Sequence, residues 1–185
     1  MRQRQRPTRE LPSLWMMTDE RIAEDRLLRA ARRLPRGGGI VLRHYRLPEA
    51  ERRALFARLR RIARRRGLLL FLAGDGRQAA DWGADGSHGG KRLNGLPHSM
   101  PVHDGRELLA AGRTGADLIF LSPLFATRSH PGARPLGVFR FAALARRSPV
   151  PVMALGGTAP RHARLVRLLG AAGFGAIDAF AIGGA

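Results

Sequence analysis

Histidine is the residue type in this sequence best suited to moving a proton, because its pKa lies near neutrality. His88 and His103 end predicted strands, and His130 lies in the loop that follows another. We interpret these three as candidates for acid–base chemistry. The other three histidines are interpreted as hydrogen-bonded structural residues: His44, His98 and His162. Three histidines could also bind a metal ion, but their spacing does not favour one.

A phosphate site is indicated by two segments in the C-terminal half of the chain. Gly156–Gly157 follows the apolar run Val152–Leu155 and precedes a predicted helix, so backbone N–H groups and the helix dipole can face an anion. The loop over residues 122–137 is rich in Gly and Pro, as active-site loops often are. Its Thr127, Arg128 and Ser129 offer hydroxyl and guanidinium donors to a phosphate. A tight turn and a ligand-free Pro-rich loop are the structural alternatives.

The elements that must position these residues alternate along the chain. Apolar runs predict strands over residues 14–18, 40–42, 68–73, 85–88, 100–103, 117–121, 150–155 and 176–181. Amphipathic stretches predict helices over residues 22–34, 48–66, 78–82, 107–113, 138–146 and 160–169. We expect the arginines of the long second helix to form a solvated face. Strand–helix alternation favours a closed (β/α)8 TIM barrel of the α/β class, small and with its last helix missing or vestigial. An open, doubly wound sheet is the alternative.

In such a barrel, functional side chains come from the C-terminal ends of the strands. This rule adds Arg43, Asp75 and Asp178 to the histidines and the phosphate-binding segments. Three glycine-containing patterns precede predicted strands and are interpreted as structural turns at the opposite end of the barrel. They are Gly83–Gly86, Gly115–Leu118 and Gly173–Ala176.

Composition bounds the class of protein. The 185 residues suit one barrel domain over residues 13–185, preceded by a basic tail over residues 1–12. The absence of cysteine excludes disulfides and Cys-ligated zinc or iron–sulfur sites. The sequence has neither a signal peptide nor an apolar run of about 18 residues, so we expect a cytoplasmic protein that spans no membrane.

The net charge of +19 could attract nucleic acid or small anions. Lys91 is the single lysine among 33 basic residues, and the arginines are spread over several segments. This pattern indicates a coding preference for arginine rather than a nucleic-acid-binding surface. Small phosphorylated molecules are therefore the expected partners, and nucleic acid is not.

Five segments resemble motifs of one known family, in the same order and at matching spacing. They are Leu14-Trp-Met-Met-Thr-Asp19, Ile40-Val-Leu-Arg-His-Tyr45, Gly83-Ala-Asp-Gly-Ser-His88, Ser122-Pro-Leu-Phe-Ala-Thr127 and Pro151-Val-Met-Ala-Leu-Gly-Gly157. On these residues the chain resembles the thiamine-phosphate synthase and TenI family over nearly its whole length. The resemblance implies the closed barrel directly. It also implies a homodimer as a possible assembly, because family members often dimerise.

The resemblance implies two activities. Synthases of the family join hydroxymethylpyrimidine diphosphate to thiazole phosphate and release pyrophosphate, with Mg2+ and basic residues stabilising the diphosphate. TenI-type relatives tautomerise a thiazole phosphate carboxylate, and a histidine after the fifth strand moves the proton. By resemblance, His103 and Arg43 are then catalytic, and Asp75 would bind Mg2+. The substrate- or phosphate-binding residues would be Thr127, Arg128, Ser129, His130, Gly156, Gly157 and Asp178.

The chain departs from the family pattern mainly on the diphosphate side. Val41 and Tyr45 stand where the family has Gln and Lys, and Gly89–Leu93 lacks the carboxylate of the second magnesium ligand. Thiamine-phosphate synthesis is the first interpretation. Two alternatives stay open: a thiazole tautomerase that uses His103, and a barrel that binds a phosphorylated ligand without turnover.

Overall fold

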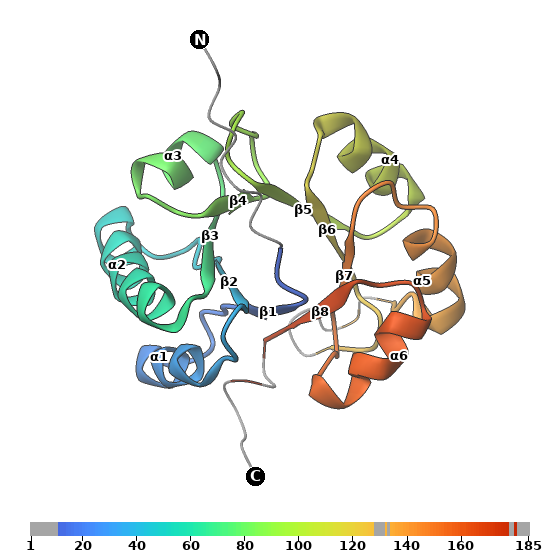
Figure 1. Cartoon of the computed structure of the whole chain (residues 1–185), viewed down its shortest axis with the longest axis horizontal. Coiled ribbons are helices and arrows are strands. Elements are labelled where there is room, and N and C mark those ends of the chain that lie inside the picture. The colour runs from blue at the N-terminus through green and yellow to red at the C-terminus, as the bar shows by residue number, and fades with distance from the viewer. Residues whose placement is uncertain (1–10, 128–131, 133, 178–179, 181–185) are drawn as a thin grey trace.

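The computed structural model describes residues 11–127, 132, 134–177 and 180. Eight parallel strands close into a barrel in sequence order, with helices around it (Figure 1). The strands are β1 (Leu14–Met17), β2 (Gly39–Leu42), β3 (Leu69–Ala73), β4 (Gly86–His88), β5 (His98–Val102), β6 (Leu118–Leu121), β7 (Val152–Ala154) and β8 (Gly173–Ala176). This closed ring confirms the expected small (β/α)8 TIM barrel and excludes the open sheet.

Helices cover the outside of the barrel. They are α1 (Glu24–Arg33), α2 (Glu49–Arg66), α3 (Gly76–Asp81), α4 (Gly105–Thr114), α5 (Gly137–Ala145) and α6 (Ala163–Leu168), the last preceded by a 3-10 turn at Pro160–His162. A loop over residues 89–97 joins β4 to β5 without a helix. After β8 the structure describes only Ile177 and Phe180, so the expected loss of the last helix falls outside the described residues. Within the described ranges, no helix is long and apolar enough to cross a bilayer.

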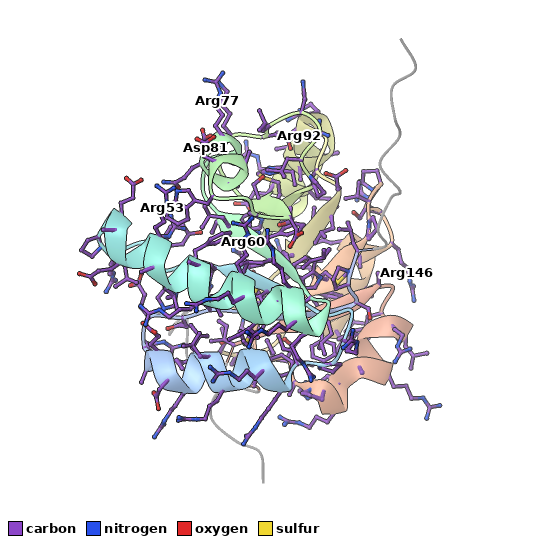
Figure 2. All side chains as sticks on the ribbon, turned by 60° about the vertical axis from the view of Figure 1, so that its left-hand side comes forward. Arg53, Arg60, Arg77, Asp81, Arg92 and Arg146 are labelled. Carbon is purple, nitrogen blue, oxygen red and sulfur yellow. The ribbon has the colours of Figure 1, made fainter. Side chains whose placement is uncertain are left out.

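Helix α2 shows why an arginine-rich segment folds as an amphipathic helix. Its buried apolar side chains recur three or four residues apart and face the sheet: Leu55, Phe56, Leu59, Ile62 and Ala63. Glu49 in its first turn and the arginines of its last turn complement the helix dipole. Figure 2 shows arginine side chains, Arg53 and Arg146 among them, projecting outward from the elements around the barrel.

Aromatic rings fill the barrel interior. Trp15 contacts Phe71 and Phe120 edge to face, with ring centroids 4.8 and 5.7 Å apart. Gly39 and Gly86 give these rings room, since a Cβ atom on either would lie within 2.4 Å of the Trp15 or Phe71 ring. Large rings opposite glycines therefore pack the interior without a central channel.

The residues just before β1 contact this interior cluster. The indole N–H of Trp15 donates to the carbonyl oxygen of Pro12 at 2.7 Å, and Leu11 packs against the same inner cluster. The first ten residues of the expected basic tail lie outside the described residues.

Strand β8 begins three residues and ends five residues earlier than the expected 176–181. Gly173–Ala176 is therefore the strand itself, and its interpretation as a turn is wrong. The cause is steric: the Phe174 N–H donates to the Ser13 carbonyl oxygen at 2.9 Å, and a Cβ on Gly173 would lie 1.9 Å from that oxygen. Only glycine lets β8 approach the start of β1 this closely.

We predict that Gly173→Ala destabilises the barrel. The added methyl group must push β8 away from Ser13, which should cost about 1–3 kcal/mol in the free energy of unfolding. Gly105→Ala is the matched control, because a Cβ on Gly105 would meet no atom nearer than 3.7 Å and alanine favours a helix. Urea denaturation measures both variants, and equal stabilities would contradict the contact.

Candidate active site

Arg43 is fixed just beyond β2, at the mouth where the C-terminal ends of the strands meet. Its amide N–H donates to Thr18 Oγ1 at 2.9 Å, and its Nε donates to the Thr18 carbonyl oxygen at 2.7 Å. Its Nη2 lies 3.3 Å from Oδ2 of Asp19. Burial lowers the pKa of Arg43, yet the guanidinium stays charged because its ordinary pKa is far above neutrality. Arg43 is thus a positively charged residue at the mouth, positioned by its contacts with Thr18 and Asp19.

Asp19 is the negatively charged partner of Arg43. Arg21 also binds it, with Nε 2.8 Å from Oδ1 and Nη2 3.0 Å from Oδ2. Partial burial alone would raise the pKa of Asp19, but the hydrogen bonds and charge of Arg21 and the charge of Arg43 outweigh it, so the pKa is lowered. Asp19 is therefore ionised and shared by two arginines.

Arg52 is a buried residue that the sequence interpretation places wrongly on the solvated face of α2. Its exposed fraction is 9%, and its Nη2 donates to the carbonyl oxygens of Arg43 at 2.9 Å and Ala73 at 2.5 Å. It therefore ties the end of β2 to the end of β3. The signal for this role is its spacing, because Arg52 lies three residues before Leu55 and seven before Leu59, on their buried face.

The three histidines interpreted as structural each have a hydrogen-bond partner. His44 Nδ1 lies 2.9 Å from Thr18 Oγ1, and His98 Nδ1 lies 2.8 Å from Ser87 Oγ. His162 Nδ1 accepts from the Ala159 amide at 3.2 Å. Burial lowers the pKa of all three.

His88 differs from the expected acid–base group. It ends β4, has an exposed fraction of 5%, and its ring centroid lies 5.3 Å from that of Phe120 in the barrel interior. Its Nδ1 lies 2.9 Å from Ser99 Oγ. Burial, with smaller effects from the charges of Arg43 and His98, lowers the pKa of His88 to about 3. A histidine that is neutral throughout the neutral pH range does not fit proton exchange there.

His103 follows β5 and is paired with a carboxylate. Its Nδ1 lies 2.8 Å from Glu107 Oε2, and the same oxygen accepts from the His103 amide at 2.7 Å. Asp104 caps α4 by accepting from the amides of Arg106 and Glu107. These backbone hydrogen bonds lower the pKa of Asp104. The sequence singled out His103 but missed Glu107, whose signal is its place four residues on, in the first turn of the helix.

The predicted phosphate-binding residues that the structure describes share one small cavity. Its volume is ≈ 50 Å³, and its lining residues are Thr127, Leu155, Gly156, Gly157, Thr158, Ala176 and Ile177. Thr158 Oγ1 donates to the Gly175 carbonyl oxygen, which ties the β7 loop to β8. The space suits one small polar group rather than a drug-sized ligand of about 300 Å³ or more.

The two glycines of this cavity are required by the fold. Gly156 and Gly157 have φ angles of +88° and +65°. A Cβ on Gly156 would lie 2.7 Å from Cα of Pro123, and one on Gly157 would lie 2.7 Å from the Ala126 carbonyl oxygen. Neither amide N–H donates to an atom of the described residues, so both are available to an anion.

The remaining predicted site residues divide into two groups. Arg128, Ser129, His130 and Asp178 lie outside the described residues. Asp75 is exposed and caps α3, with its Oδ1 accepting from the Arg77 amide at 2.7 Å.

The carboxylates and histidines of the described residues do not form a preassembled metal site. No group of three or more such side chains lies close enough to bind a metal ion within this part of the chain. Mg2+ in such sites is usually bound by one or two carboxylates, with waters and substrate phosphates supplying its other oxygen ligands. Asp75 stands alone, and the neighbouring loop carries Lys91 and Arg92.

The comparisons with known proteins agree with this architecture. The family model described as thiamine monophosphate synthase matches residues 14–180. The chain belongs to the thiamine monophosphate synthase family. It is 30% identical over 180 residues to the thiamine-phosphate synthase of Chloroflexus aurantiacus, which covers 90% of this chain and 83% of the relative. It is 28% identical over 183 residues to putative thiamine-phosphate synthase 2 of Aquifex aeolicus, with 92% and 98% covered.

A solved structure shows the same fold. Thiamine phosphate pyrophosphorylase from Pyrococcus furiosus superposes with a TM-score of 0.77 at 24% identity, covering 92% of this chain and 87% of that chain. The resemblance read from the five sequence motifs is confirmed as membership of the thiamine monophosphate synthase family.

We predict that His88→Asn changes the pH dependence of stability. Below its ordinary pKa of 6.5, His88 takes up a proton in the unfolded chain but not in the folded one, whose pKa is about 3. Stability from this group is therefore lost as the pH falls from about 6.5 toward 3. The stability difference between wild type and His88→Asn should shrink by about 2 kcal/mol between pH 7 and pH 5. Urea denaturation at several pH values measures it, and parallel curves would contradict the assignment.

Proposed function

We propose that this chain synthesises thiamine phosphate from hydroxymethylpyrimidine diphosphate and thiazole phosphate. The observation that carries the proposal is the cavity that gathers Thr127 with Gly156 and Gly157, at the same mouth as Arg43. The names of the curated relatives, thiamine-phosphate synthases, support the same reaction.

In the proposed reaction, each half of the mouth binds one substrate. The thiazole phosphate group binds at the hydroxyl of Thr127 and the amides of Gly156 and Gly157. Arg128, Ser129, His130 and Asp178 belong to the same proposed substrate-binding set.

Arg43 binds the diphosphate of the second substrate. The bond between the pyrimidine methylene carbon and the diphosphate oxygen breaks, and the bonding pair leaves with pyrophosphate. The thiazole nitrogen then forms the new bond to that carbon. Arg43 stabilises the negative charge that develops on the leaving group.

The family's use of Mg2+ does not carry over directly to this chain. Asp75 is the residue proposed to bind the ion, but it is a single exposed carboxylate. Because no group of three or more ligating side chains lies together among the described residues, the proposed steps are written for this chain's own residues alone.

The first test measures thiamine phosphate by oxidation to its fluorescent product, with purified protein, both substrates and Mg2+. We expect product, and we expect Arg43→Gln to lower turnover about 100-fold because a cation at the leaving group is lost. Arg77→Gln, which removes an exposed arginine of α3 (Figure 2), should leave turnover unchanged.

A further assay and one contrary outcome complete the test. Repeating the assay with a chelator shows whether Mg2+ is required. Absence of product from folded protein that still binds thiazole phosphate would sink the synthase proposal.

A second candidate function is favoured by the His103–Glu107 pair. A tautomerase removes a proton from one atom of a thiazole phosphate carboxylate and returns it at another, which needs a positioned base and no metal. Glu107 Oε2 binds both His103 Nδ1 and the His103 amide, and so holds the ring by its Nδ1 edge.

If the chain is a tautomerase, His103→Gln should lower turnover about 100-fold or more. Binding of thiazole phosphate, measured by calorimetry, should stay within about twofold because His103 lines no part of the phosphate cavity. Glu107→Gln should give an intermediate loss. Unchanged tautomer turnover in His103→Gln would remove this candidate.

A further inference from the structure

A groove runs between α1 and α2 on the outside of the barrel, where the two helices lie side by side (Figures 1 and 2). Its volume is ≈ 370 Å³. None of the described residues that line it is acidic. Five of them are arginines: Arg32 of α1 and Arg58, Arg61, Arg65 and Arg66 of α2.

Two contacts define how α1 lies along α2. Arg58 forms an ion pair with Glu24 at the start of α1, and Arg66 Nη2 donates to the carbonyl oxygen of Leu34, directly after α1, at 2.8 Å. The two helices therefore run in the same direction. Their acidic residues lie in the first turns and their last turns are basic, so the basic ends lie together. In a β/α barrel this end of the helices is opposite the mouth.

Most of the groove arginines have no acidic partner. Arg58 pairs with Glu24, but Arg32, Arg61 and Arg65 are exposed and form no ion pair within the described ranges. Arg61 lies three residues after Arg58 and four before Arg65, and like charges at this spacing destabilise a helix. A coding preference raises the number of arginines but does not gather them around one hollow. A bound anion would relieve their repulsion.

The helix dipole does not account for this arrangement. Its effect falls off within the last turn, and Arg58 and Arg61 lie before the last turn of α2. The groove also has an apolar floor, which consists of the buried Ile62 and the half-buried Leu28. A solvated arginine face requires neither a hollow nor an apolar floor. The groove therefore fits a ligand that has both an anionic and an apolar part.

The spacing of the arginines indicates the length of the anionic part. Arg58 and Arg65 are seven residues apart, which is about 10 Å along a helix. A single phosphate is too short to contact both, whereas a chain of three phosphates is of comparable length. Guanidinium groups bind phosphate oxygens in a bidentate manner, and they also stack on flat rings.

We propose that this groove is a binding site for a nucleoside triphosphate. The phosphate chain lies along Arg58, Arg61 and Arg65, and the base lies on Leu28 and Ile62. The groove shares no lining residue with the phosphate cavity of the mouth, so both sites can be occupied together. The proposal does not depend on which reaction the mouth performs.

The first test measures ATP binding by calorimetry at physiological ionic strength. The double variant Arg61→Gln/Arg65→Gln should weaken binding about tenfold or more, because two charge-assisted contacts are lost. Arg53→Gln/Arg64→Gln is the matched control and should stay within about twofold, since it removes the same charge from exposed positions of α2 outside the groove (Arg53 in Figure 2). Equal weakening in both variants would show attraction to net charge alone and overturn the proposal. Absence of binding to the wild type would also overturn it.

The second test compares ligands. Tripolyphosphate should bind more tightly than inorganic phosphate, and ATP more tightly than tripolyphosphate. Leu28→Ala should weaken ATP binding about threefold or more, because apolar contact with the base is lost, and leave tripolyphosphate binding unchanged. Equal affinities for phosphate and tripolyphosphate would overturn the assigned chain of phosphates. Equal affinities for tripolyphosphate and ATP would overturn the assigned nucleoside.

The third test separates the groove from the mouth, which also binds phosphorylated ligands in the proposed function. Arg43→Gln should leave ATP affinity within about twofold, and Arg61→Gln/Arg65→Gln should leave thiazole phosphate binding within about twofold. Loss of ATP binding in Arg43→Gln would place the nucleotide at the mouth and overturn the proposal. These measurements decide the proposal whether or not the chain forms thiamine phosphate.

Discussion

Closure of the barrel between β1 and β8 is the contact on which the arrangement of the mouth depends. Leu14 pairs with Phe174 and Met16 with Ala176, and the approach is close enough to require glycine at position 173. Because all the strands are parallel, closure brings every C-terminal strand end to one rim. Segments far apart in the sequence, such as those of Arg43 and Thr127, therefore meet at the same mouth. The packed rings of Trp15, Phe71 and Phe120 leave the rim as the place for a ligand.

Burial leaves two neighbouring basic residues at this rim in different charge states. It lowers the pKa of both Arg43 and His88. Arginine remains a cation because its ordinary pKa is far above neutrality, whereas histidine starts near 6.5 and becomes neutral. The result is a cation beside a neutral imidazole.

Membership of the family and the presence of a magnesium site depend on different features of the chain. Membership rests on a match across residues 14–180, while a magnesium site needs a few particular oxygen ligands in one place. The described carboxylates are used in other ways: Asp19 pairs with two arginines, and Asp75 caps α3. A shared barrel therefore does not by itself carry the family's metal chemistry to this chain.

The sequence by itself determined the alternation of strands and helices, since period-based patterns such as that of α2 are local and strong. It also determined the motif order that marks the family, and it singled out Arg43, His103 and the Gly156–Gly157 turn. Tertiary structure decided what depends on neighbours distant in the chain. The glycines of β8 resemble a turn until Ser13 lies against them, and Arg52 resembles a solvated arginine until the carbonyls of β2 and β3 accept its hydrogen bonds. The charge state of His88 was decided in the same way, because a pKa depends on burial and nearby charges, neither of which is local in sequence.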